Sequence, residues 1–130
     1  MIVVDSSAMV RLLLRLSPYG DIDALTLGSA ETLHAPHLLD VEVAHALRRI
    51  AAAGEIGAER GLLALEMLRA FDIERHAHGD LLPRVWSLRR NFTAYDALYV
   101  ALAESLDARL LTRDGNLSAA IKTHTGVKVL

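Results

Sequence analysis

The stretch TAYDALYVALAESLDARLLTRD, residues 93–114, predicts a helix, a tight connection and a strand, with a carboxylate near each end. Thr93 is a helix-capping residue, and leucines then follow at helical spacing. The apolar run at residues 108–112 has the length of a short strand. At about 100° of rotation per residue, Asp96 lies at the border of the buried face of the helix. A carboxylate in this position is costly to ionise unless a cation faces it.

The rest of the chain alternates apolar, β-type runs with helical segments, and the connections are short. Strands are expected at residues 2–4, 32–35, 71–75, 108–112 and 127–130. Helices are expected at residues 7–15, 21–30, 37–53, 57–70, 82–90 and 93–106, with a short one ending at 121. This order predicts an α/β fold, a three-layer α/β/α sandwich around a mostly parallel five-stranded sheet. Residues 1–130 are expected to form a single domain.

The amino-acid composition excludes several kinds of site and of protein. The chain has 130 residues, 52% of them hydrophobic, no cysteine and a net charge of -2. Lack of cysteine excludes disulfides, thiolate metal sites and a cysteine nucleophile, and it fits a reducing cytosol, so a cytoplasmic location is expected. Charged residues interrupt the apolar N-terminus, and we therefore expect neither a signal peptide nor a membrane span. The net charge gives no basic excess of the kind that nucleic-acid binding usually shows.

Four acidic residues lie where the predicted fold would bring them together. Asp5 follows the first strand and Asp114 follows the fourth, which should be its neighbour in the sheet. Glu42 and Asp96 come from helices whose first turns should lie at the same edge. Because open α/β sheets bind ligands beyond the carboxyl ends of their strands, the predicted site is at this edge.

Each acid also has a structural explanation when it is taken alone. Asp5 could be the N-cap of the first helix. Glu42 could extend to water or pair with Arg49. Asp96 stands three residues after Thr93, which is a capping box in its own right. The joint placement of the acids is what favours a functional site.

Converging carboxylates repel one another unless a cation compensates their charge. Oxygen ligands favour Mg²⁺ or Mn²⁺ as that cation, and such ions activate water for phosphodiester hydrolysis. Ser6 and Thr112 have hydroxyls that could hold a water ligand or a carboxylate, and Arg113 could contact phosphate. We therefore predict catalytic and metal-binding roles for the four acids and supporting roles for these three residues.

Six histidines are scattered along the chain. His34 with His37, or His76 with His78, could bind a metal ion, but no zinc-binding motif surrounds them. They are interpreted as ordinary surface or capping residues.

Together, the acidic motifs resemble those of PIN-domain ribonucleases, and most of all those of the VapC toxins of bacterial and archaeal toxin–antitoxin pairs. The motifs are IVVDSS at residues 2–7, VEVAHALR at 41–48, TAYDALYVALA at 93–103 and LLTRD at 110–114. The resemblance covers the chain end to end, and its specificity lies in the order of the four acids. His45 departs from the family pattern, in which many members have Asn three residues after the glutamate.

The resemblance implies a PIN-like fold and Mg²⁺- or Mn²⁺-dependent endoribonuclease activity on structured RNA, such as tRNA or ribosomal RNA. It also implies homodimerisation and inhibition by a small VapB antitoxin, whose C-terminal segment often places an arginine among the acids. No membrane partner is implied.

Two other classes of protein were weighed. A phosphoacceptor receiver domain is also an acid-lined α/β fold, but it would need a second acid beside Asp5, where Ser6 stands, and an acceptor aspartate after the third strand, where His76 stands. The other alternative is a catalytically inactive PIN domain that serves as a binding module, and the four intact acids argue against it.

Overall fold

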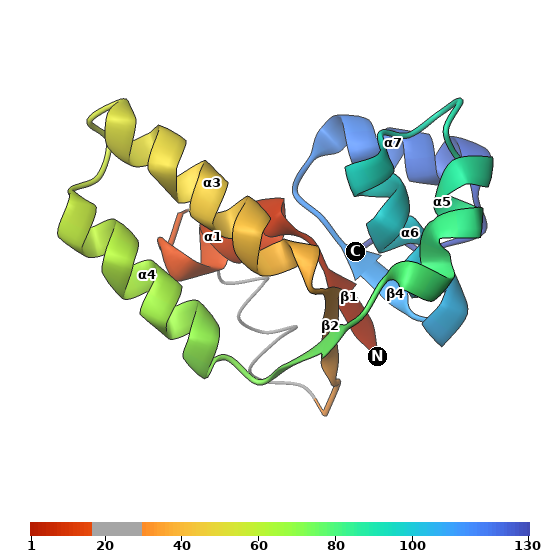
Figure 1. Cartoon of the computed structure of the whole chain (residues 1–130), viewed down its shortest axis with the longest axis horizontal. Helices are drawn as coiled ribbons and strands as arrows, with labels where there is room; N and C mark the ends of the chain where they lie inside the picture. Colours follow the sequence, from red (N-terminus) through yellow and green to blue (C-terminus); the bar gives the residue numbers. More distant parts are fainter. Residues whose placement is uncertain (17–29) are drawn as a thin grey trace.

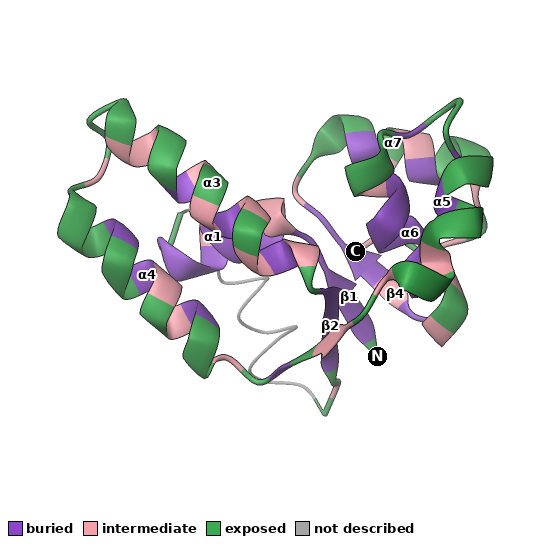
Figure 2. Cartoon of the chain, in the orientation of Figure 1, coloured by how far each residue is buried: buried purple, intermediate pink, exposed green. Residues whose placement is uncertain are grey.

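The computed structural model describes residues 1–16 and 30–130, and these residues form a parallel four-stranded sheet in the order β3-β2-β1-β4 (Figure 1). The strands are β1 (Ile2–Val4), β2 (Leu33–Pro36), β3 (Ile73–His76) and β4 (Arg109–Leu111). The expected α/β class, the parallel sheet and the pairing of the first strand with the fourth are confirmed. Strands β1 and β2 are buried throughout, as a β-branched or apolar run covered on both faces should be (Figure 2).

The expected fifth strand is wrong. Residues 127–130 lie beside β4 but form only an isolated parallel bridge, between Leu110 and Val129. Two backbone hydrogen bonds of 2.9 Å, from Leu110 N–H to Lys128 and from Leu130 N–H to Leu110, complete this contact. A single bridge does not make a strand, so the described sheet has four strands.

Helices cover both faces of the sheet, which gives the predicted three layers (Figure 1). The helical elements are α1 (Ser6–Leu13), α3 (Leu38–Ala52), α4 (Ala58–Ala70), η1 (Gly79–Leu81), α5 (Leu82–Ser87), α6 (Ala94–Leu106) and α7 (Gly115–His124). Helices α1, α3 and α4 pack together on one side, and α5, α6 and α7 lie on the other. The helix expected at residues 21–30 falls, except for its last residue, outside the described residues.

Helix α6 is the centre of the second layer. Its predicted cap is confirmed, since the Thr93 hydroxyl accepts a hydrogen bond from Asp96 N–H at 3.1 Å. Every residue from Ala97 to Ala103 is buried, because the helix lies between α5 and strands β1, β2 and β4. The helix is therefore buried over more of its surface than the single leucine-bearing face predicted from the sequence. At its end, Asp107 adopts the left-handed conformation (φ 49°) that ends many helices.

Several element boundaries differ from the expected ones. Helix α3 stops before Gly54 as predicted, and that glycine has φ 77°, which only glycine adopts without strain. Strand β3 begins later than expected because Phe71 still donates its N–H to the last turn of α4. Helix α5 ends at Ser87, short of the predicted residue 90. Among the described residues, no helix is both long and apolar enough to span a membrane.

Candidate active site

Asp5 is held by three donors at the carboxyl end of β1. Its Oδ1 accepts hydrogen bonds from Ala8 N–H at 3.0 Å and from the Ser7 hydroxyl at 2.7 Å, and the Thr112 hydroxyl donates to Oδ2. The residue is 4% exposed, and burial raises the pKa of its carboxyl group although the hydrogen bonds act in the opposite direction. Asp5 is thus the N-cap of α1, and it is also a buried acid with a fixed orientation.

Asp114 lies at the same edge because β4 pairs directly with β1. Val4 is in register with Leu111, and Asp5 N–H donates to the Leu111 carbonyl at 3.1 Å. Asp114 is the N-cap of α7, where its Oδ1 accepts two backbone hydrogen bonds of 2.9 and 3.1 Å. Its own N–H donates to the Thr112 hydroxyl at 3.1 Å, which links it to the residue that binds Asp5. The charge of Asp114 raises the pKa of Asp5, so the two carboxyl groups interact across the strand pair.

Glu42 comes from α3 and is bound by a residue of the opposite layer. The hydroxyl of Tyr99, on α6, donates to Glu42 Oε1 at 2.6 Å. Burial, and then the bond to Glu42, raises the pKa of Tyr99, so this phenol stays protonated and donates at neutral pH. Burial also raises the pKa of Glu42, and the charge of Asp5 adds to the effect. The Glu42–Tyr99 bond therefore ties the α3 side of the site to α6.

Asp96, in the first turn of α6, is the acid on which the other three act together. Its pKa is raised to about 6, first by burial and then by the charges of Asp114, Glu42 and Asp5. The Asp96 carboxyl group thus interacts electrostatically with each of the three other predicted acids, so the four acids lie in one region of the molecule.

The supporting residues lie differently from the sequence expectation. Thr112 donates a hydrogen bond to Asp5, as expected. The second hydroxyl that binds Asp5 is that of Ser7 and not that of Ser6, which lines a surface hollow together with Glu42. The Arg113 guanidinium donates to the main-chain carbonyls of Thr112 and Leu130, at 3.1 and 3.3 Å, so it binds backbone in this structure. Sequence reasoning did not single out Tyr99, although it stands one helical turn after Asp96 and so shares its side of α6.

Two adjoining hollows in the surface run past the acids. One contains Glu42 and Tyr95, the other contains Asp114, and the two share Ser6 and Arg49. Arg49 does not appear as the hydrogen-bond partner of Glu42, whose recorded partner is Tyr99. The cationic side chain of Arg49 therefore lines both hollows, the one with Glu42 and the one with Asp114.

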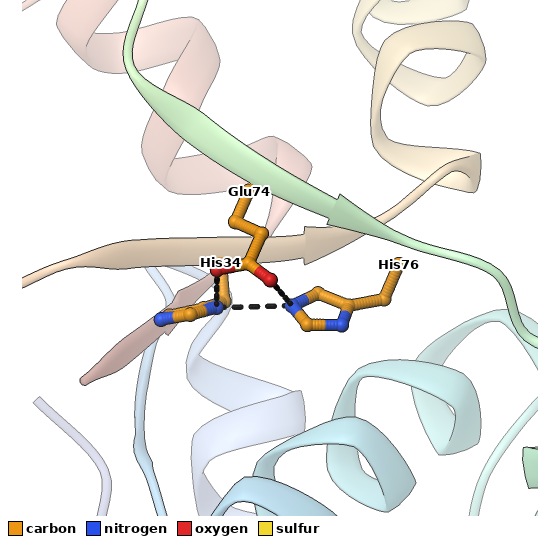
Figure 3. Close-up of side chains that lie close together, drawn as sticks. All are labelled: His34, Glu74 and His76. Carbon is orange, nitrogen blue, oxygen red and sulfur yellow. Dashed lines mark hydrogen bonds and ion pairs between the residues drawn. The ribbon is translucent and has the colours of Figure 1, made fainter.

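The four carboxylates are coupled through space without forming a tight cage. Among the described residues, the group of histidine and acidic side chains whose candidate ligand atoms all lie within 4.8 Å of one another is His34, Glu74 and His76, elsewhere in the sheet (Figure 3). Since Mg²⁺ keeps several waters and needs only one or two direct carboxylates, the all-oxygen donor set fits Mg²⁺ or Mn²⁺.

The histidines in that second group correct the sequence interpretation. His34 is buried and hydrogen-bonded to His76, with 2.9 Å between Nδ1 and Nε2, so it is not a surface or capping residue. Neither of the histidine pairs considered from the sequence is this one. The pairing arises from the alignment of β2 with β3, which no local motif reveals.

Comparison with known proteins places the chain in a class. A family model described as PIN domain matches residues 2–122. Over 118 residues the chain is 46% identical to Ribonuclease VapC9 of Mycobacterium tuberculosis strain H37Rv, and the alignment covers 91% of this chain and 89% of that protein. The chain belongs to the VapC ribonucleases of the PIN-domain family.

Solved structures agree on the fold. PAE2754 from Pyrobaculum aerophilum has a TM-score of 0.69 and 26% sequence identity, over 98% of this chain and 81% of its own. VapBC2 from Rickettsia felis, solved with a DNA fragment from its promoter, has a TM-score of 0.71 at 14% identity, over 100% of this chain and 98% of its own. These matches do not favour the receiver-domain alternative.

Proposed function

We propose that this VapC-family protein is a metal-dependent endoribonuclease toxin that hydrolyses phosphodiester bonds in structured RNA, such as tRNA or ribosomal RNA. Its catalytic and metal-binding residues would be Asp5, Glu42, Asp96 and Asp114. The observation that carries the proposal is the convergence of the acids at one sheet edge, where Thr112 links Asp5 to Asp114 and where burial and the three other acids raise the pKa of Asp96 to about 6. Such a charge cluster at the ligand-binding edge of a parallel sheet needs a cation.

Mg²⁺ or Mn²⁺ is the cofactor that we propose for this cluster, held by carboxylates of the four acids. All donors are carboxylate oxygens, and neither thiolate nor imidazole stands among them, which favours hard cations over zinc. The chemistry that such an ion supplies when bound is activation of a water and neutralisation of charge on the phosphate group.

The chain's own residues would prepare this chemistry by positioning. Ser7 and Thr112 fix both oxygens of Asp5, and Tyr99 fixes one oxygen of Glu42. Because these donors are in place before any ligand arrives, the carboxylates need little rearrangement to bind a cation. Arg49, in the groove beside Glu42, is a candidate for contact with an RNA phosphate.

Membership of the VapC family suggests two protein partners. We propose a VapB-type antitoxin as inhibitor, and a second copy of the chain as dimer partner. The VapBC2 structure supports the first because it shares the fold. Large exposed apolar side chains, among them Val41 and Tyr95 near the groove and Leu62 and Leu63 on α4, are available for such contacts. Residues 1–130 would act as a single PIN domain.

Cleavage assays with matched variants test the proposal. The full chain is incubated with total RNA and with tRNA, in MgCl₂ or MnCl₂ and in a chelator. We expect Asp5→Asn to lower the cleavage rate by about a hundredfold or more, because it removes a ligand charge from the site. Asp107→Asn is the control, since Asp107 is exposed at the far end of α6 and Asn tolerates its left-handed conformation.

Equal cleavage by Asp5→Asn and wild type would contradict the proposed site. Absence of cleavage in wild type, together with no heat on titration with Mg²⁺ or Mn²⁺, would instead identify an inactive PIN domain that serves as a binding module.

A further inference from the structure

A second cluster of ligand-type side chains lies where β2 meets β3, away from the four acids. His34 on β2 is in register with Glu74 on β3, and His76 stands two residues further along the same strand. Because alternate residues of a strand point to one face, Glu74 and His76 both reach His34 (Figure 3). His34 Nδ1 lies 2.9 Å from His76 Nε2 and 3.6 Å from Glu74 Oε2, and His76 Nε2 lies 3.9 Å from Glu74 Oε1.

We propose that His34, Glu74 and His76 form a metal site of their own, selective for a divalent transition ion of the zinc type, which ties the edge strand β3 to β2. Two imidazoles and one carboxylate are a donor set that zinc and similar ions favour over Mg²⁺.

The geometry is close to what such an ion needs. Ligands about 2.0–2.1 Å from a tetrahedral zinc ion lie about 3.4 Å from one another. The 2.9 Å between the two imidazole nitrogens is shorter than that value, and the 3.6 and 3.9 Å from these nitrogens to the two different oxygens of Glu74 are longer. Small side-chain rotations would equalise them, and these involve the more exposed Glu74 and His76, whose side chains are 67% and 22% exposed. Because Glu74 is mostly exposed, the cluster borders solvent, from which a tetrahedral ion would take a water as its fourth ligand.

Thr32 prepares the buried histidine for this role. Its hydroxyl lies 2.8 Å from His34 Nε2. A proton on Nε2, donated to this hydroxyl, leaves the lone pair of His34 on Nδ1, which faces His76 and Glu74. Without metal, His76 Nε2–H can donate to that lone pair. Metal binding then requires the other tautomer of His76, with the proton on Nδ1 and the lone pair of Nε2 facing the ion.

The electrostatics of this cluster are separate from those of the acids. Burial lowers the pKa of His34, so its imidazole is neutral near pH 7, as a ligand must be. The charges that act on it are those of Glu74, His76 and the N-terminal amine, and none of the four acids is among them.

Calorimetric titration with ZnSO₄ tests the site directly. Saturating MgCl₂ is present so that the acidic cluster is occupied, and the full chain is used. We expect wild type to bind one zinc ion per chain, and Glu74→Gln and His76→Gln to bind it about tenfold more weakly or not at all. The control is His124→Gln, because His124 is an exposed histidine on α7. Asp96→Asn should bind zinc as wild type does, which separates this site from the proposed active site.

A positioning variant and a stability measurement complete the test. Thr32→Val should weaken zinc binding by about tenfold, because it removes the acceptor that orients His34. Zinc should raise the melting temperature of wild type and of His124→Gln, and leave that of His76→Gln unchanged. The proposal is overturned if wild type gives no heat, or if Glu74→Gln and His76→Gln bind zinc as wild type does.

Discussion

The acidic cluster and the histidine cluster both gather polar side chains at the sheet, but they differ in how those side chains are compensated. The four acids carry charges of one sign, and each that shows a shift has its pKa raised. In the other cluster, the His34 ring is hydrogen-bonded to the Thr32 hydroxyl and to His76, and Glu74 extends to solvent. The acids thus need a cation to balance their negative charge. The buried histidine, by contrast, already has hydrogen-bond partners within the chain. Function that depends on a cation should therefore be found first at the acids.

Removing a hydroxyl from the acidic cluster should give the largest effect in this comparison. Thr112→Val takes away the donor to Asp5 Oδ2 and the acceptor of Asp114 N–H. We expect Mg²⁺ affinity and RNA cleavage to fall by about 10- to 100-fold, because the orientation of a ligand is lost. Unfolding in urea should show a loss of about 1–3 kcal/mol, since a buried carboxylate loses a partner. Wild-type affinity in this variant would show that Asp5 needs no such support.

The pH dependence of stability should separate the clusters next. Asp96 has a folded pKa of about 6 against the ordinary value of 3.8 for an aspartate, so the folded protein binds an extra proton between these pH values. Its charge consequently destabilises the metal-free fold as pH rises towards 6, and fully above it. We expect metal-free Asp96→Asn to be more stable than wild type by about 1–2 kcal/mol at about pH 7.5, after allowance for partial exposure. The difference should be about half as large at about pH 5, and it should vanish only below about pH 4, where Asp96 is protonated in both the folded and the unfolded state.

Urea unfolding at both pH values, with Asp107→Asn as control, makes this measurement. A wild type more stable than Asp96→Asn at about pH 7.5 would mean that the carboxylate is already compensated within the chain.

The histidine cluster should give the smallest change in the absence of metal. His76→Gln removes a neutral hydrogen bond to His34 from a partly exposed position. We expect the free energy of unfolding to fall by about 1 kcal/mol or less, with RNA cleavage unchanged. Thermal unfolding and the cleavage assay check this, and a loss of cleavage would mean that the two clusters are coupled.

Much of the fold was predictable because its signals are local. The strand that ends at Asp5, the cap at Thr93 and the stop at Gly54 each depend on a few neighbouring residues, and the structure has them as expected. The fifth strand failed because residues 127–130 have the right composition, but only one bridge to β4 forms. Composition indicates that a segment can be a strand, and it does not indicate how far the strand pairs.

The four acids of the candidate site could be predicted from the sequence, but the residues that hydrogen-bond to them could not. Ser6 was the predicted hydroxyl, whereas Ser7 makes the bond to Asp5, and a shift of one residue turns a helical face by about 100°. Tyr99 lies on α6 and Glu42 on α3, so their bond depends on how two layers pack. The pair of His34 and His76 depends on strand register. None of these long-range relations can be read from local spacing.

Calorimetric titration of Mg²⁺ into wild type, Asp96→Asn and Asp107→Asn, at about pH 7.5, tests the central claim most directly. The claim is that the four acids hold a divalent cation because their charges are pooled. We predict clear binding by wild type and by Asp107→Asn, and binding about tenfold weaker or absent in Asp96→Asn. Equal Mg²⁺ affinity in all three proteins would contradict it.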